Sequence, residues 1–263
     1  MKNEKIVKNP YVNLKTYIKK DEYKVETPLI IANNLKHAFR QKGGFKTIYE
    51  NISFEIFKNE RLAFLGPNGS GKSLTVATIA GIIKPKAGKI TYKYSYKHSP
   101  YEKISVQFQD LQFPNSLTPW DLIKFTMKLN GINENDNELL SALEIFEIDK
   151  IKHTKMSKLS GGQQQRVNVF ISMLGKPKVL FLDEFTTGLD IAIKYKLQTY
   201  ILEYCKKHKI TLVIVSHDID CIEEMVDRII ILANKKIYLD AYTKDIINEF
   251  GSVKNMLKKY ILA

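Results

Sequence analysis

Short apolar runs alternate with helix-like spacing along the chain and predict a sheet flanked by helices. Runs typical of strands occur at residues 29–35, 47–56, 61–65, 104–108, 179–183 and 211–215. A helical spacing of apolar residues, at Leu74, Val76, Ile79 and Ile82, follows the third run, and a helix-length segment separates the last two. Strands that alternate with helices in this way favour an α/β fold with a parallel sheet.

The composition is globular and fits one large domain or two small ones: 44% of the 263 residues are hydrophobic and 26% are charged. The longest apolar runs, 210–215 and 229–232, are far shorter than the roughly 18 to 20 residues of a membrane helix. Lysine and asparagine interrupt any apolar core near the N-terminus, which argues against a signal peptide. We therefore expect a cytoplasmic protein in which Cys205 and Cys221 remain thiols.

The net charge of +13 raises the question of a nucleic-acid partner, but only four of the 41 basic residues are arginine. Arginine is preferred for two-pronged contacts with phosphates and bases, and no single basic stripe stands out. The charge therefore gives little support to nucleic-acid binding. Residues 1–28 are polar, weakly periodic and basic, and they predict an N-terminal extension before the folded body.

A glycine-rich segment joins the run at 61–65 to the helical pattern that follows it. The segment consists of Gly66, Pro67, Asn68, Gly69, Ser70, Gly71, Lys72 and Ser73. Glycines allow backbone N–H groups to surround phosphate oxygens at the positive end of a helix. Lys72 would reach the β- and γ-phosphates of a nucleotide, and Ser73 would bind Mg²⁺. The alternative is a glycine turn before a helix, with Lys72 there by coincidence.

Two adjacent carboxylates, Asp183 and Glu184, end the apolar run at 179–183. The carboxyl ends of parallel strands line the ligand crevice of an α/β sheet. Asp183 would hold Mg²⁺ through a water molecule. Glu184, the next residue, would point the other way and could deprotonate an attacking water. The alternative is that both carboxylates simply terminate a strand.

With the pentapeptide Leu159, Ser160, Gly161, Gly162 and Gln163, the sequence resembles the ATP-binding cassette (ABC) ATPases, whose signature this is. The resemblance covers residues 29 to about 240 and includes every landmark in order. These are Walker A at 66–73, the Q-loop Gln109, the signature at 159–163, Walker B at 179–184, the D-loop at 186–190 and the switch His217. It implies a P-loop NTPase with an antiparallel β subdomain and a helical subdomain at about 110–160.

The resemblance also implies roles for residues that mean little by themselves. Gln109 would bridge Mg²⁺ and the attacking water, and His217 would bind the γ-phosphate and the catalytic carboxylate. Ser160 sits where a helix N-cap belongs, so the helix that follows offers a second anion site. In the family this helix closes on ATP held by the opposite subunit of a head-to-tail dimer. The nucleotide-binding set implied is completed by Leu74, Gly161, Gly162, Gln163 and Asp190.

The aromatic residue that stacks on adenine is less sharply defined. Phe39 matches the family position best, Phe45 and Tyr49 are near it, and each of them could instead be a core aromatic. The sequence departs from the common family pattern at Leu74, at Phe185 after Walker B, and at 234–236, where a glycine is usual. None of these departures removes a catalytic group, so we still expect ATP hydrolysis.

The remaining segments follow from the same comparison. We assign 29–240 to the ABC ATPase domain and 241–263 to a helical C-terminal tail. Thr118 to Asp121 form a capping box with Pro119 at the first helical position. Phe113, Pro114 and Trp120 are candidate contacts for a coupling helix of a membrane subunit, although Trp120 could equally be buried core.

The function that these features imply is the ATP-binding subunit of an ABC transporter, peripheral on the cytoplasmic face of the membrane. Its partners would be transmembrane permease subunits and a second ABC ATPase, identical or not. Two phrases, 101–110 and 125–133, resemble single-cassette exporters of the drug and peptide type. The alternative is a soluble ABC ATPase that acts on ribosomes or DNA. A binding module without turnover conflicts with the presence of Glu184 and His217.

Overall fold

The computed structural model describes residues 27–42, 44–109, 113–134 and 136–260, and it contains two sheets. The smaller sheet is antiparallel, with strand order β2 (Gly44–Phe57), β1 (Pro28–Gln41), β4 (Ala87–Tyr92). The larger sheet has the order β5 (Ile104–Gln107), β6 (Val179–Asp183), β7 (Thr211–Val215), β3 (Arg61–Leu65), β8 (Arg228–Ala233), β9 (Lys236–Tyr242). Its first five strands are parallel, and β9 pairs antiparallel with β8.

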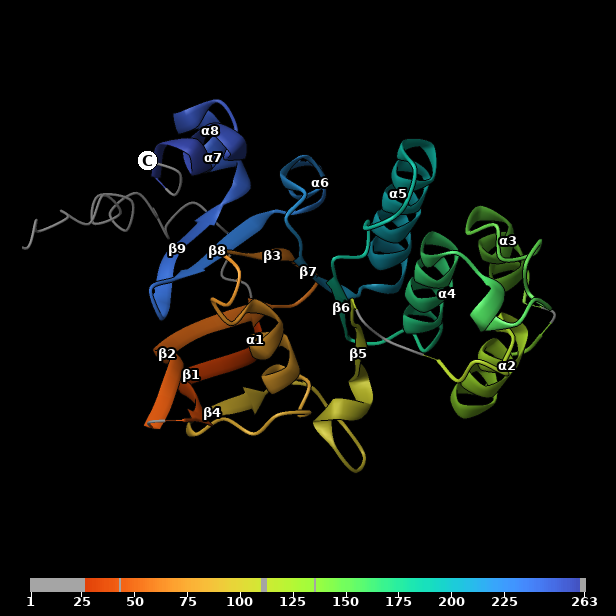
Figure 1. Ribbon diagram of the computed structural model, residues 1–263, viewed down its shortest axis with the longest axis horizontal. Helices are drawn as coiled ribbons and strands as arrows, with labels where there is room; N and C mark the ends of the chain where they lie inside the picture. The colour runs from red at the N-terminus through yellow and green to blue at the C-terminus, as the bar shows by residue number, and fades with distance from the viewer. Residues whose placement is uncertain (1–26, 43, 110–112, 135, 261–263) are drawn as a thin grey trace, which may run out of the picture.

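The helices lie on both sides of the larger sheet (Figure 1). They are α1 (Lys72–Ile79), α2 (Pro119–Asn130), α3 (Asn137–Ile145), α4 (Gly161–Leu174), α5 (Ile191–His208), α6 (Ile219–Met225), α7 (Thr243–Phe250) and α8 (Val253–Tyr260). Short 3₁₀ turns span Pro100–Lys103 and Met156–Lys158. In Figure 1, α2 and α3 form a lobe beside α4, and α1 lies with the antiparallel sheet at the other end.

The central strands are apolar except at one end of each, because both of their faces are buried. In β3, Ala63 and Leu65 face the core that contains α4, α5 and α6. Leu62 and Phe64 face the opposite core, formed with α1 and the antiparallel sheet. The larger sheet therefore separates two hydrophobic cores, and its carboxyl edge is left for polar side chains.

The strands predicted at 61–65, 179–183 and 211–215 have the bounds expected. The first two strands are longer than predicted, since β1 and β2 continue as a hairpin in which Gln41 pairs with Gly44. The helical position assigned to Ile82 was wrong: α1 ends at Ile79, and Ile82 is 60% exposed. The chain turns at Gly81, with φ of 74°, where a Cβ would lie 2.2 Å from the ring of Tyr101.

Two helix starts confirm the capping pattern expected from the sequence. Thr118 accepts a hydrogen bond from the Asp121 N–H at 3.2 Å, and the Asp121 carboxylate accepts one from the Thr118 N–H at 2.9 Å. Ser160 and Gln163 form the same reciprocal box at the start of α4. Each box satisfies two backbone groups that the helix itself leaves open.

The two ends of the chain differ in what the structure describes. Residues 1–26 of the expected N-terminal extension lie outside the described residues, and β1 already begins at Pro28. At the other end β9 continues to Tyr242, so the expected helical tail begins after it with α7 and α8. Within the described residues, no helix has the length and apolarity needed to cross a membrane.

The turn between β8 and β9 forms without the glycine usual in the family. Asn234 and Lys235 both have positive φ, 48° and 66°. Asparagine tolerates this region well, whereas lysine is strained in it. The carbonyl of Lys235 accepts a hydrogen bond from the Glu50 N–H at 3.0 Å, which helps to hold the turn against β2.

Candidate functional site

The glycine loop leaves the carboxyl end of β3 and runs directly into α1. Gly66 has φ of 142°, and a Cβ there would lie 2.0 Å from the carbonyl oxygen of Leu232, so only glycine fits. Gly71, the N-cap of α1, has φ of 99° and packs against the ring of Tyr49. The loop therefore places backbone N–H groups and the positive end of α1 around one point.

Lys72 points back across this loop. Its ammonium donates hydrogen bonds to the carbonyl oxygens of Gly66 at 2.8 Å and Pro67 at 3.2 Å. Burial lowers the pKa of Lys72, and the nearby charges of Glu184 and Asp183 partly oppose that shift. The side chain is thus held at the loop as a positive charge that an anion can approach.

Asp183 and Glu184 line the same cavity, so the expectation that they point in opposite directions was wrong. The strand alternation stops because Glu184 has a left-handed backbone, with φ of 51°. Two hydrogen bonds fix this conformation: the Glu184 N–H donates to the Val215 carbonyl at 2.8 Å, and the Gln165 amide donates to the Glu184 carbonyl at 3.2 Å. Backbone strain of this kind is concentrated at functional sites.

The Glu184 carboxylate has few partners for a half-buried charge. Ser216 Oγ lies 3.5 Å from one oxygen, and His217 Nε2 lies 3.7 Å from the other, which is buried without a hydrogen bond among the described residues. Burial raises the pKa of Glu184, the neighbouring Asp183 adds to the shift, and His217 opposes it. A carboxylate with a raised pKa is a stronger base, which suits proton abstraction from water.

One cavity of about 340 Å³ brings most of the expected site together. It lies at the carboxyl ends of β3, β6 and β7, where such crevices bind ligands. The side chains and glycines of the site that line it are Phe39, Asn68, Gly69, Gly71, Lys72, Ser73, Leu74, Gln109, Asp183, Glu184 and His217. Gly66, Pro67 and Ser70 belong to the same loop and are not among the residues that line the cavity.

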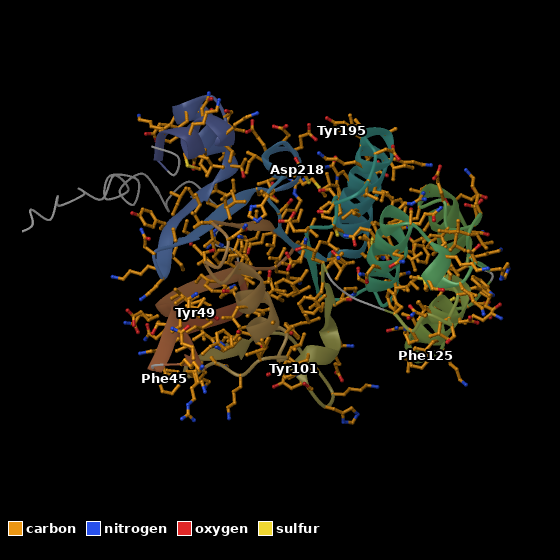
Figure 2. All side chains as sticks on the ribbon, in the orientation of Figure 1. Phe45, Tyr49, Tyr101, Phe125, Tyr195 and Asp218 are labelled. Atoms are coloured by element: carbon orange, nitrogen blue, oxygen red, sulfur yellow. The ribbon has the colours of Figure 1, made fainter. Side chains whose placement is uncertain are left out.

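The structure separates the three aromatic candidates for adenine. Phe39 lines the cavity and is 47% exposed, which leaves a ring face available for stacking. Phe45 is 70% exposed at an outer corner of the antiparallel sheet, whereas Tyr49 is buried within it (Figure 2). Tyr49 contacts Thr78 through its hydroxyl at 3.4 Å. Phe39 therefore remains the candidate that the geometry favours.

The oxygen donors around the loop fit a hard divalent cation. Ser73, Gln109 and Asp183 supply a hydroxyl, an amide oxygen and a carboxylate to the same cavity. Mg²⁺ takes oxygen ligands and usually keeps several waters beside one or two protein groups. Within the described residues, no group of three or more His, Cys, Asp or Glu side chains could hold a metal by itself, so water molecules would have to complete the coordination. This donor set matches Mg²⁺ bound together with a nucleotide.

The signature residues and Asp190 do not line this cavity. Ser160 and Gln163 are engaged in their capping box, and nothing lies within 4 Å of a Cβ built on Gly161. Gly162 packs closely on the D-loop, since a Cβ there would lie 2.5 Å from the Gly188 carbonyl oxygen. Asp190 caps α5 by accepting a hydrogen bond from the Ile193 N–H at 3.0 Å. Ser160 thus begins α4 and Asp190 begins α5, and both helix starts lie outside this cavity.

Sequence reasoning missed two amide side chains that form hydrogen bonds between elements of the site. Gln107 is fully buried and accepts a hydrogen bond from the Asp183 N–H at 3.2 Å. Asn168 on α4 donates to the Phe108 carbonyl at 3.3 Å, next to Gln109. The one available signal was a polar residue inside the apolar run at 104–108, which is unusual in a buried strand.

A scan against protein families matches residues 49–187 to the family described as "ABC transporter". The chain belongs to the ABC transporter family. A relative in Pasteurella multocida (strain Pm70), the spermidine/putrescine import ATP-binding protein PotA, is 31% identical over 78% of the chain and 57% of its own length. The sulfate/thiosulfate import ATP-binding protein CysA of Mesostigma viride is 31% identical over 84% of the chain and 64% of its own length.

The chain thus spans about three fifths of the length of these two relatives. Solved structures extend the comparison to the fold. A structure described as the ATP binding subunit of an ABC transporter superposes with a TM-score of 0.77 at 22% identity and covers 88% of this chain and 99% of its own. A dimeric bacterial ABC transporter cassette gives 0.72 at 23% identity, with 81% and 98% covered. These likenesses confirm the predicted fold, an ABC-type cassette of mixed α/β structure.

The same relatives correct one expectation. The drug- or peptide-exporter subtype is not supported, because the relatives whose names state a direction are import proteins. Of the phrases that suggested export, the described part of 101–110 lies in the 3₁₀ turn, in β5 and just after it, and 125–133 lies in α2 and the loop after it. Short resemblances in such segments say little about transport direction.

Proposed function

We propose that this chain is the ATP-binding and ATP-hydrolysing subunit of an ABC transporter of the import type. The observation that carries the proposal is the single cavity that joins Phe39, Lys72, Asp183, Glu184 and His217. An aromatic face, a phosphate-binding loop and an acid pair are the three parts that ATP hydrolysis requires.

In the proposed site, each part of the nucleotide has its own group. Phe39 stacks on adenine, the N–H groups of 69–73 surround the phosphates, and Lys72 turns from its loop carbonyls to the β- and γ-phosphates. Ser73, Gln109 and Asp183 would hold Mg²⁺. When bound, this ion would neutralise part of the phosphate charge. Glu184 accepts the proton of the attacking water. His217, whose Nε2 lies 3.7 Å from the Glu184 carboxylate, binds the γ-phosphate.

A second copy of the cassette would complete the site. At the start of α4 the Ser160 side chain caps the N–H of Gln163, which leaves the N–H groups of Gly161 and Gly162 for another acceptor. This helix end lies outside the chain's own cavity. A helix N-terminus of this kind favours an anion. We assign that anion to the γ-phosphate of ATP bound by a partner cassette, identical to this one or not.

Transport through separate membrane subunits is supported by the relatives, which are named as import ATP-binding proteins. Phe113 and Trp120 are partly buried against the core, and the ammonium groups of Lys124 and Lys152 lie 5.6 and 5.4 Å from the centre of the Trp120 ring. They remain the candidate contacts for a membrane subunit. No structural observation favours the alternative role on ribosomes or DNA.

The test is co-purification of the tagged chain from native membranes in mild detergent, followed by an ATPase assay. We expect one or more polytopic membrane proteins with the cassette, and ATP turnover that depends on Lys72. Recovery of ribosomal proteins or DNA in place of a membrane partner would contradict the transport role while leaving ATP hydrolysis intact.

A further inference from the structure

Ser216 directly follows β7 and contacts Glu184, the proposed base of the site. The two segments are joined at the backbone, because the Glu184 N–H donates to the Val215 carbonyl at 2.8 Å. They are also joined through side chains, since the Ser216 hydroxyl donates to Glu184 Oε2 at 3.5 Å. Ser216 is only 1% exposed, so bulk water does not compete for this contact.

The Ser216 hydroxyl has a second hydrogen bond that restrains its direction. Its oxygen accepts from the Asp218 N–H at 3.1 Å. A serine hydroxyl has one proton to donate and two lone pairs with which to accept. Because the oxygen already serves the Asp218 N–H as an acceptor, the proton of the hydroxyl is available to the Glu184 carboxylate.

The turn that carries Ser216 is anchored to two helices through Asp218. One oxygen of the Asp218 carboxylate caps α6 by accepting a hydrogen bond from the Cys221 N–H at 3.1 Å. The other oxygen forms an ion pair with the ammonium of Lys194 on α5. Figure 2 shows Asp218 at the start of α6. These contacts fix the peptide whose N–H binds Ser216, and they thereby fix the hydroxyl that faces Glu184.

The two oxygens of the Glu184 carboxylate are held differently. Oε2 accepts the hydrogen bond from Ser216. Oε1 has no hydrogen bond among the described residues, and His217 Nε2 lies 3.7 Å from it. A general base must lie within hydrogen-bond reach of the proton that it accepts, and small misplacements lower the rate steeply. The direction of this carboxylate therefore depends on the Ser216 hydroxyl.

We propose that Ser216 is a positioning residue for ATP hydrolysis, which holds the Glu184 carboxylate in the direction needed to accept a proton from water. It acts through Glu184 and not on the nucleotide. The inference rests on the proposed function, and it adds to that function the residue that orients the base.

Substitutions of the hydroxyl test the role by separating kcat from ATP binding. Ser216→Ala should lower kcat about tenfold, while the Kd for ATP with Mg²⁺ stays within about twofold of the wild type. Ser216→Thr keeps a hydroxyl at this position and should stay within about threefold of the wild-type kcat. Circular dichroism of each variant establishes that it is folded.

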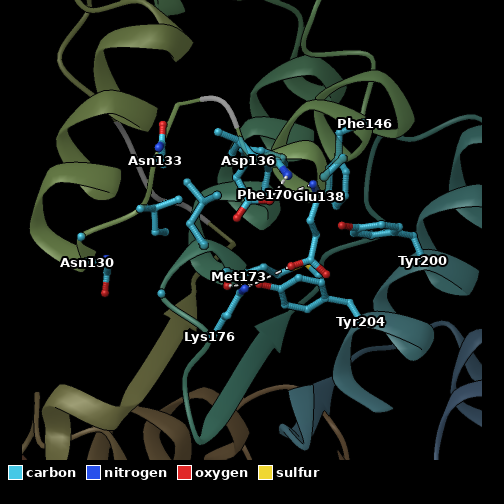
Figure 3. Close-up of a pocket in the computed structure, with 16 residues that line it drawn as sticks. Asn130, Asn133, Asp136, Glu138, Phe146, Phe170, Met173, Lys176, Tyr200 and Tyr204 are labelled. Carbon is cyan, nitrogen blue, oxygen red and sulfur yellow. Dashed lines mark hydrogen bonds and ion pairs between the residues drawn. The ribbon is translucent and has the colours of Figure 1, made fainter. Parts of the chain in front are cut away.

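Ser172→Ala is the matched control, because it removes a hydroxyl from another buried position. Ser172 is 7% exposed and donates to the Val169 carbonyl at 2.6 Å. It lies on α4 between Phe170 and Met173, which line a separate cavity of the helical lobe (Figure 3). That cavity shares no lining residue with the nucleotide cavity, so Ser172→Ala should keep the wild-type kcat.

A double-mutant cycle distinguishes positioning of the base from a general structural effect. If Ser216 acts through Glu184, Ser216→Ala should change the residual turnover of Glu184→Gln by less than about twofold. An equal loss in both backgrounds, or a wild-type kcat in Ser216→Ala, would overturn the inference and leave ATP hydrolysis by the chain intact. A wild-type chain that does not hydrolyse ATP would instead contradict the proposed function, and this inference with it.

Discussion

The side-chain amide of Gln107 accepts a hydrogen bond from the backbone N–H of Asp183 across the β5–β6 pair, at 3.2 Å. Its nitrogen donates to the Phe108 carbonyl at 2.8 Å, one residue before Gln109. Gln107 therefore connects the last residue of β6 with the peptide that leads into the Q-loop. Because the side chain is fully buried, water does not compete for these bonds.

Replacing Gln107 with Met tests that connection. Met has a similar length but removes the amide oxygen that accepts the hydrogen bond of the Asp183 N–H, so we expect the free energy of unfolding to fall by about 1–3 kcal/mol. Urea unfolding followed by circular dichroism measures the change. Gln109→Met is the control, since Gln109 is exposed and its loss should change stability by less than ~0.5 kcal/mol. Equal effects of the two variants would show that the Gln107 bonds contribute nothing specific.

Lys72→Ala should weaken ATP binding. The substitution removes the one ammonium held at the glycine loop by the Gly66 and Pro67 carbonyls. Loss of a charge-assisted contact with phosphate, about 1.5–3 kcal/mol, corresponds to a rise of at least tenfold in Kd. Titration calorimetry with ATP and Mg²⁺ measures it, with Lys196→Ala on the exposed face of α5 as control. An unchanged Kd in Lys72→Ala would remove Lys72 from the phosphate site.

Glu60 should make stability depend on pH. Burial raises the pKa of Glu60 from 4.5 to about 7. Arg228, 3.3 Å away, opposes this shift only in part, because its guanidinium also donates to the Asp240 carboxylate at 2.6 and 2.7 Å. A raised pKa in the folded state means that the proton is bound more tightly there than in the unfolded chain. The stability from this group is therefore complete below pH 4.5 and is lost as the pH rises to about 7.

Comparison with Glu60→Gln isolates this contribution, since the variant does not titrate. Relative to the variant, the wild type should lose about 3 kcal/mol of unfolding free energy between pH 4.5 and 8. Urea unfolding of both proteins across that range provides the measurement. A constant difference between them, or a wild type that gains stability with rising pH relative to Glu60→Gln, would contradict the assignment.

ATP should dimerise a chain that cannot hydrolyse it. In Glu184→Gln the γ-phosphate persists and can meet the open helix end at Ser160 of a second copy. Light scattering should then show a dimer with ATP and a monomer with ADP. Ser160→Arg in the same background should remain monomeric while it still binds ATP, whereas Ser160→Asn, which keeps an N-cap oxygen, should retain dimerisation. A monomer under saturating ATP would exclude the homodimer and leave a second, different cassette as the partner.

Sequence patterns predicted the buried centre of the fold well because its physical rule is simple. The strands of 61–65, 179–183 and 211–215 each have four consecutive apolar residues, with a single polar residue at one end, and are covered on both faces. The hairpin of β1 and β2 extends beyond its apolar runs through polar residues, where pairing between strands decides the length. The end of α1 depends on Tyr101 crossing Gly81, a contact between distant residues that periodicity cannot reveal.

The same distinction holds for the site. Motif order along the chain indicated the residues that the carboxyl edge brings together, such as Lys72 and Asp183. It placed Glu184 in the same site but could not indicate that strand alternation ends there, because this depends on a left-handed residue held by Val215 and Gln165. Gln107 was missed because its partner lies 76 residues away in sequence and is a backbone N–H.

ATP turnover by Glu184→Gln tests the central claim most directly. The variant keeps the shape of the site but loses the only carboxylate assigned to accept the proton of water, which accounts for about 10²–10⁴ in rate. Phosphate release should fall by at least a hundredfold while calorimetry still detects ATP binding, and Glu203→Gln, at an exposed position of α5, should hydrolyse ATP at the wild-type rate. Near-normal hydrolysis by Glu184→Gln would contradict the role of Glu184 and with it the proposed mechanism.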